Sequence, residues 1–171
     1  HDKHLRVGFN PAPLPKDRMD FVIEKSVELG ATDLHPVLTD HADIRKINAE
    51  RVRAQTIEAA EQCERLTVPV LHPLVALDHK LAGWNEDCTV FAAIERGEAP
   101  LIRNLPRAVY HGRDLAILVG PAGGFSTTEK EWLPHVPGIQ PVSLGEHILR
   151  ADTAILAMLA VLQLKGDDHE L

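Results

Sequence analysis

The 171-residue sequence is poor in cysteine, in aromatic residues and in long apolar runs. Its two cysteines, Cys63 and Cys88, are too few for a small disulfide-stabilised domain and suit a reducing cytoplasm. The longest apolar run, residues 154–162, is far shorter than the roughly 20 residues that span a bilayer. We therefore expect a cytoplasmic protein that has no membrane-spanning helix and no membrane partner.

Several chemical motifs are also missing. The ten histidines form no HExxH motif and no close pair with cysteine, so we expect no metal. Neither cysteine lies in a nucleophile motif, and no GxSxG sequence is present. The chain opens on His1 without a secretory pattern, so we expect a processed protein or a fragment of a longer one.

Acidic residues outnumber basic ones, 25 to 18, for a formal net charge of −7. An acidic chain is a poor candidate for indiscriminate nucleic-acid binding. Basic residues nevertheless gather in residues 45–53 and 103–113, either as solvated charges or as local basic faces. The hydrophobic content of 44% favours one globular domain. We assign it to residues 1–165, followed by an acidic tail at 166–171.

Strand-like and helix-like patterns alternate along the chain. Strands are expected near residues 5–9, 33–38, 67–71, 88–94, 115–119 and 139–144, and helices near 16–29, 48–64, 75–84, 100–105, 126–135 and 152–165. The run at 115–119 is apolar without alternation, as in a parallel strand covered on both faces. The pattern predicts an α/β fold with a mostly parallel sheet and helices on both faces.

The last predicted helix is apolar at nearly every position from 154 to 162. A helix that is apolar all round must be covered all round. Near the end of a small domain, this favours self-association. The alternative is a helix buried within one large core.

Two loops could build a ligand site. Gly120-Pro-Ala-Gly-Gly-Phe125 follows a buried strand and precedes a predicted capped helix. Ser143-Leu-Gly-Glu-His-Ile-Leu-Arg150 joins the last strand to the last helix. Ligands of parallel sheets bind beyond the carboxyl ends of the strands, so the two loops could share a pocket. The glycine-rich loop matches neither a Walker A nor a GxGxxG motif, and the alternative for it is a tight turn that only requires glycine. The alternative for the second loop is that its arginine and the following aspartate only form an ion pair and cap the helix.

Four strings occur together and in order: EKSVELGATDLHPVLTD, EAAEQCERLTVP, LVGPAGGFSTTE and SLGEHILRADTA. With them the chain resembles the RsmE family of 16S ribosomal RNA uridine-N3 methyltransferases, in the SPOUT superfamily, over residues 5–163. The combination of GPxGG with LGxxILRxxTA carries most of the specificity. A generic α/β nucleotide enzyme would leave the four strings unexplained.

The resemblance implies a C-terminal trefoil knot, a homodimer with its pocket near the interface, and S-adenosylmethionine as the cofactor. The substrate implied is a uridine in 16S ribosomal RNA, free or in the small ribosomal subunit. The cofactor-binding residues implied are Ala93, Ile94, Glu95, Val119, Gly120, Pro121, Gly124, Leu144, Gly145, Ile148, Leu149 and Thr153.

The chemistry of the reaction suggests roles for the remaining residues. Uridine N3 becomes a good nucleophile only when it loses its proton, and the negative charge then spreads over the flanking carbonyl oxygens. Arg150 is the candidate to stabilise that charge, and Asp152 is the candidate to orient Arg150 or to accept the proton. Arg65, with Arg45 and Lys46, would hold RNA phosphate.

Three departures from the family pattern keep alternatives open. Ala122 replaces the glutamate of GPEGG, and Ala151-Asp152-Thr153 replaces Thr-Glu-Thr. The family's N-terminal RNA-binding domain of the PUA kind also has no counterpart in this sequence. There are two alternatives. One is a knotted RNA-binding module that is catalytically weak or inactive, and the other is a SPOUT methyltransferase that acts on another RNA site.

Overall fold

The computed structural model describes residues 5–9, 16–94, 98–111 and 113–166. In chain order, the strands and α-helices are β1 (Leu5–Phe9), α1 (Lys16–Glu28), β2 (Ala31–Leu38), α2 (Ala49–Gln62), β3 (Val70–Leu71), β4 (Val75–Ala76), α3 (Leu77–Ala82), β5 (Cys88–Ala93), β6 (Asp114–Val119), α4 (Thr127–Trp132), β7 (Ile139–Val142) and α5 (Ala151–Gly166). Short 3₁₀ turns are η1 (Ile102–Asn104), η2 (Arg107–Val109) and η3 (Leu133–His135). The strand order is β3-β2-β1-β6-β5-β7, with β4 beside β2, and every pairing between these strands is parallel.

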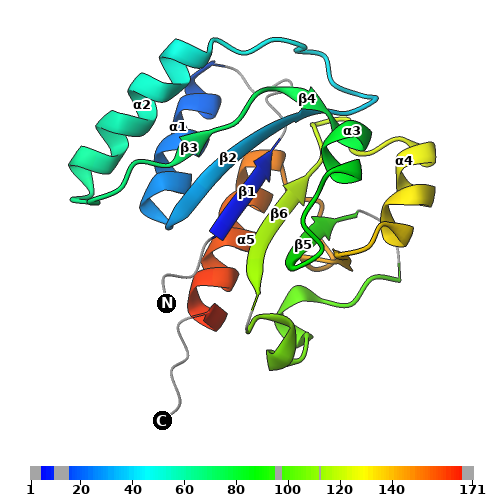
Figure 1. The fold of residues 1–171 in the computed structure, drawn as a ribbon. Coiled ribbons are helices and arrows are strands. Elements are labelled where there is room, and N and C mark those ends of the chain that lie inside the picture. The colour runs from blue at the N-terminus through cyan, green and yellow to red at the C-terminus, as the bar shows by residue number, and fades with distance from the viewer. Residues whose placement is uncertain (1–4, 10–15, 95–97, 112, 167–171) are drawn as a thin grey trace.

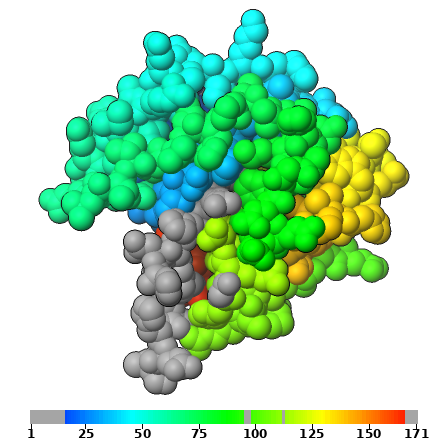
Figure 2. All heavy atoms as spheres, viewed as in Figure 1, coloured from blue at the N-terminus to red at the C-terminus, as the bar shows by residue number. Residues whose placement is uncertain are grey.

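Helices cover both faces of the sheet (Figure 1). On one face of the sheet, Val22 and Ile23 of α1 and Ile155 of α5 pack in one core with buried side chains of the strands. On the other, Leu77 of α3 and Leu133 of η3 belong to a second core. Figure 2 shows the segment that contains β3, β4 and α3, in green, on the face toward the viewer, and α4, in yellow, beside it. The predicted α/β fold with a parallel sheet is confirmed.

Several boundaries differ from the predictions. The strand expected at 67–71 is reduced to Val70–Leu71, and the helix expected from residue 75 begins only at Leu77, after β4. Residues 100–105 contain only a 3₁₀ turn, and the last strand ends at Val142. Pairing with β2 explains the second change, because Val75 lies opposite Val37 in a parallel register that a helix cannot form.

The last helix, α5, has two different sides. Ile155, Met158, Leu159 and Leu162 are at most 2% exposed and lie in the core with α1 and β6. Leu156, Ala160 and Leu164 lie four residues apart on another side, where Leu164 is 74% exposed. The core therefore covers only part of this apolar helix.

None of the helices in the described part of the chain has the length and apolar character that a membrane span requires.

The chain beyond β7 passes close to the segment that follows β5. The amide of Ser143 donates to the carbonyl of Pro100 at 2.9 Å, and the amide of Ile102 donates to the carbonyl of Ser143 at 3.0 Å. The chain then enters α5, which packs against α1 and β6. The trefoil knot remains a prediction from the family resemblance.

Candidate functional site

A cavity of about 480 Å³ lies at the carboxyl ends of three neighbouring strands. Ala93, Val119 and Val142, the last residues of β5, β6 and β7, all contribute to its wall. Because β5 lies between β6 and β7, the three following loops start side by side. The turns around Gly120 and Gly145 line this one cavity, as the two-loop hypothesis requires.

Most of the residues predicted to bind the cofactor line the cavity. These are Ala93, Ile94, Val119, Gly120, Pro121, Gly124, Leu144, Gly145, Ile148 and Leu149. Glu95 lies outside the described residues. Thr153 is exposed on α5 and is not part of the cavity wall, so the structure gives no support to its predicted contact with the cofactor.

Glycine is required at two turns of the cavity wall. Gly124 has a φ of +70° and closes a turn in which its amide donates to the carbonyl of Pro121 at 2.7 Å. Gly145 has a φ of +128°. Residues with a Cβ rarely adopt these values, so both loops depend on glycine for their path along the cavity.

The glycine-rich loop is fixed by the residues around it. The predicted capping box is present: Glu129 accepts from the amide of Ser126 at 2.8 Å, and Ser126 Oγ accepts from the amide of Glu129 at 3.1 Å. Glu129 is only 3% exposed and also accepts from the amide of Asp40, at 3.2 Å. His41 Nδ1 lies 3.1 Å from the carbonyl oxygen of Gly123. The segment after β2 therefore holds the loop in place, and the sequence alone gives no sign of this contact.

Two guanidinium groups line the cavity. Arg150 comes from the loop before α5, as predicted, and Arg18 comes from the first turns of α1. Neither side chain has a hydrogen-bond or ion-pair partner among the described residues, so both are available to an anionic or carbonyl-bearing ligand. Arg18 was missed because it lies about 100 residues before the glycine-rich loop, and only the fold brings them together.

Asp152 is the second residue predicted to act in catalysis, either by orienting Arg150 or by accepting the proton. The described residues contain no ion pair between Asp152 and Arg150, which leaves the predicted orienting role without support. Asp152 does not line the cavity, although its neighbours Arg150 and Ala151 do. Its Oδ1 atom is buried and has no hydrogen-bond partner in the described structure. An unsatisfied buried carboxylate oxygen is unfavourable and is typical of a site whose partner arrives with a ligand.

Arg65, which was predicted to hold RNA phosphate, forms hydrogen bonds with the protein backbone, and its contact with RNA stays a prediction. Its Nη1 donates to the carbonyl of Val27 at 2.8 Å and to the carbonyl of Ala31 at 2.7 Å. Burial lowers the pKa of the Arg65 guanidinium. This side chain joins the C-terminal end of α1 to the start of β2. A positive charge at the C-terminal end of a helix also interacts favourably with the helix dipole. Arg45 and Lys46 are exposed on the loop between β2 and α2.

Comparison with known proteins identifies the family. The model of the RNA methyltransferase domain family matches residues 2–163. The small-subunit ribosomal RNA methyltransferase E of Rickettsia conorii is 32% identical over 159 residues, which cover 93% of this chain and 64% of the relative. The chain thus spans less than two thirds of the length of this curated relative.

Two solved structures have the same fold. One is the methyltransferase E of Neisseria gonorrhoeae bound to S-adenosylmethionine, with a TM-score of 0.82, 30% identity, and coverage of 95% of this chain and 66% of that one. The other is a putative methyltransferase of Legionella pneumophila with the same cofactor, with a TM-score of 0.79, 30% identity, and coverage of 94% and 66%. The chain belongs to the RNA methyltransferase domain family and, within it, to the RsmE group that its four sequence strings indicated.

Proposed function

We propose that this protein is an S-adenosylmethionine-dependent methyltransferase that methylates N3 of a uridine in 16S ribosomal RNA. The observation that carries the proposal is the cavity shared by the glycine-rich loop and the Arg150 loop. Membership of the RNA methyltransferase domain family supports it. So do the two similar structures, both of which hold bound S-adenosylmethionine.

The residues of the cavity fit this cofactor. A volume of about 480 Å³ lies within the range of about 300–1,000 Å³ that is usual for small-molecule sites. Apolar side chains such as Ile94 and Leu149 offer a surface for an adenine ring, and the backbone at Gly120 and Gly145 offers polar groups at close range. S-adenosylmethionine, when bound, supplies an electrophilic methyl group on a positively charged sulfur.

Arg150 is proposed as the catalytic cation. Loss of the N3 proton places negative charge on the uracil carbonyl oxygens, and the guanidinium of Arg150 would donate hydrogen bonds to one of them. Because that charge is larger in the transition state than in the ground state, the contact would accelerate the reaction and not only bind the base. The guanidinium of Arg150 has no hydrogen-bond or ion-pair partner among the described residues, so its donors are available for this role.

Asp152 is proposed as the proton acceptor, acting through a water molecule. Asp152 follows Arg150 by two residues but does not line the cavity. We therefore place a water molecule between its carboxylate and the uracil base. The buried Oδ1 of Asp152, which has no partner among the described residues, would accept a hydrogen bond from that water. As the methyl group is transferred, the water would take the N3 proton and pass one of its own protons to the carboxylate.

The RNA is proposed to lie across a surface that includes Arg18, Arg45 and Lys46. Arg18 lines the cavity, and Arg45 and Lys46 are exposed on the loop that also fixes the glycine-rich turn. Phosphate contacts of this kind set affinity and position on RNA. We further propose a homodimer through α5, a cytoplasmic location, and one methyltransferase domain over residues 1–165.

The proposal is tested by incubating small ribosomal subunits, or their isolated RNA, with the protein and S-adenosylmethionine. Mass spectrometry of the digested RNA should then detect N3-methyluridine. The assay is run with this chain alone and with an RNA-binding domain joined at its N-terminus. Donor binding measured by calorimetry without any methyl transfer would favour the inactive RNA-binding module. A methyl group on another nucleotide would favour a SPOUT enzyme with a different target.

Arg150→Ala should abolish methyl transfer in a single-turnover assay and leave the affinity for S-adenosylmethionine within a few-fold of wild type. Loss of one charged transition-state contact typically costs about 10²–10³ in rate. Arg103→Ala is the matched control, because Arg103 is exposed and lies outside the cavity. Equal rates for Arg150→Ala and wild type would reject the catalytic role of Arg150.

A further inference from the structure

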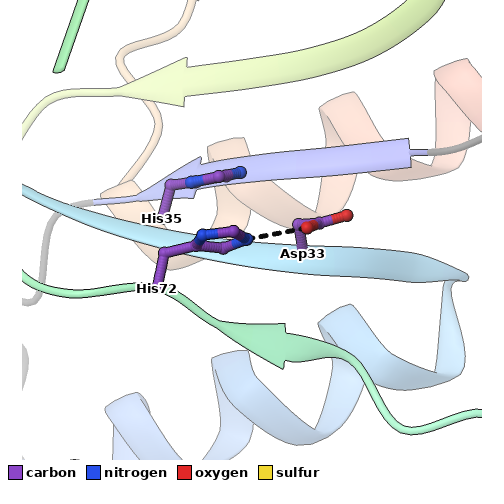
Figure 3. A group of neighbouring side chains, drawn as sticks. All are labelled: Asp33, His35 and His72. Carbon is purple, nitrogen blue, oxygen red and sulfur yellow. Dashed lines mark hydrogen bonds and ion pairs between the residues drawn. The ribbon is translucent and has the colours of Figure 1, made fainter. Parts of the chain in front are cut away.

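A second polar cluster lies apart from the cavity. Asp33 and His35 are on β2, and His72 directly follows β3 (Figure 3). None of the three lines the cavity at the ends of β5, β6 and β7, and β1 separates β2 from β6 in the sheet. The proposed methyl transfer therefore makes no use of these side chains.

The three side chains are in close contact. His72 Nε2 lies 2.7 Å from Asp33 Oδ1, and the rings of His35 and His72 stack with centroids 3.9 Å apart and planes inclined by 19°. In Figure 3, both rings extend toward the carboxylate of Asp33. One potential ligand atom from each residue lies within 4.8 Å of the other two.

This donor set suits zinc. Imidazole nitrogen and carboxylate oxygen bind Zn²⁺ with bonds of about 2.0–2.2 Å, which place neighbouring ligand atoms about 3.3 Å apart. Asp33 and His72 are already in contact, whereas the ring of His35 is stacked on that of His72 and would have to tilt to bring a nitrogen to the same ion. Three protein ligands leave a fourth position for water, as in open zinc sites.

The surroundings also fit an ion site. Thr32 Oγ1 donates to Asp33 Oδ2 at 2.8 Å, which orients the carboxylate and leaves Oδ1 facing His72. The backbone amide of His72 donates to the carbonyl of Leu34 at 2.9 Å and fixes the position of that residue beside β2. Outer contacts of this kind orient metal ligands. His35 is 5% exposed, whereas the side chains of Asp33 and His72 are 18% and 31% exposed and give solvent a way in.

We propose that Asp33, His35 and His72 form a zinc site that joins the segment after β3 to β2. The sequence-based expectation of no metal missed it because Asp33 and His72 are 39 residues apart and meet only when β3 pairs with β2. The site rests on geometry that is independent of the proposed methyltransferase activity.

The test uses the full chain, free of any purification tag and stripped of metal with a chelator. Competition with a chromophoric zinc chelator should yield one Zn²⁺ per chain, and His72→Asn should weaken the affinity at least tenfold. His79→Asn is the matched control, since His79 is exposed on α3 and outside the cluster. Co²⁺ added to the wild-type chain should give the visible absorption of a four- or five-coordinate site, and the band should be absent from Asp33→Asn.

Two results would overturn the proposal. One is equal zinc affinity in wild type, His72→Asn and His79→Asn, which would assign the binding to other histidines. The other is a wild-type chain that takes up no stoichiometric Zn²⁺ and gives only the spectrum of aqueous Co²⁺. Because the Co²⁺ measurement on wild type needs no variant, a folding defect in His72→Asn would not obscure the answer.

Discussion

Gly30 occupies the corner where α1 ends and β2 begins. It has a φ of +90°, and a Cβ at this position would lie 2.0 Å from Nε2 of Gln163. That amide nitrogen donates to the carbonyl of Leu29, so α5 closes against the end of α1 at this residue. Gly30 therefore combines a conformation that favours glycine with a close approach between two helices.

Gly30→Ala should lower the free energy of unfolding by at least about 1 kcal/mol, because the left-handed conformation is strained and the Gln163 contact must move. Gly83→Ala is the matched control: its added Cβ would have no atom within 4 Å, and its φ is −103°. Urea denaturation of the two variants measures the difference. Equal stabilities would show that the corner tolerates a side chain.

Single residues also mark the limit of prediction from sequence. The helix predicted near residues 16–29 does end just before Gly30, but the contact of this corner with Gln163 joins residues more than 130 positions apart. Arg65 was expected to hold RNA phosphate. The sequence does not reveal whether an arginine at a helix end faces solvent or donates to backbone carbonyls, as Arg65 does. Arg18 gave no signal, because only the fold brings this residue of α1 to the cavity at the carboxyl ends of β5, β6 and β7.

At the scale of elements, local patterns were sufficient where each element carried its own signal. The apolar run of β6 and the capping box of α4 were predicted and are present. The strand predicted at 67–71 is shorter than expected and β4 was not predicted, because the extended conformation of β3 and β4 depends on pairing with β2. The convergence of two loops at one cavity was predictable because the carboxyl ends of parallel strands share one edge.

The contact between the β2 segment and α4 leads to a prediction. Glu129 accepts hydrogen bonds from the amides of Ser126 and Asp40, and both would lose their partner in Glu129→Ala. We expect this variant to be destabilised by about 2–3 kcal/mol and to bind S-adenosylmethionine more weakly, because the glycine-rich loop loses its support. Urea denaturation and calorimetry measure the two effects.

Glu131→Ala is the control for this variant, because Glu131 is exposed on the same short helix and its loss changes helix charge equally. It should retain both stability and donor affinity. A Glu129→Ala protein with wild-type donor affinity would mean that the loop keeps its shape without the contact to Asp40.

At the scale of the whole molecule, the fold and the family were predictable, whereas the proposed homodimer stays a prediction that rests on α5. The helix was expected to need cover on all sides, and the core covers only the side that carries Ile155, Met158 and Leu162. The side with Leu156 and Leu164 continues the apolar surface outward. Self-association through this side of α5 would bury it.

Leu164→Lys should therefore shift the protein from dimer toward monomer. Burial of one leucine contributes about 1.5–3 kcal/mol, so its loss from both chains should raise the dissociation constant at least tenfold. Lysine suits the last turn of a helix, which keeps α5 itself intact. Leu66→Lys is the control, because Leu66 is fully exposed and lies far from α5 in the chain. Sedimentation equilibrium should show a dimeric wild type and a dimeric Leu66→Lys; a monomeric wild type, or equal dissociation of both variants, would assign α5 no role in assembly.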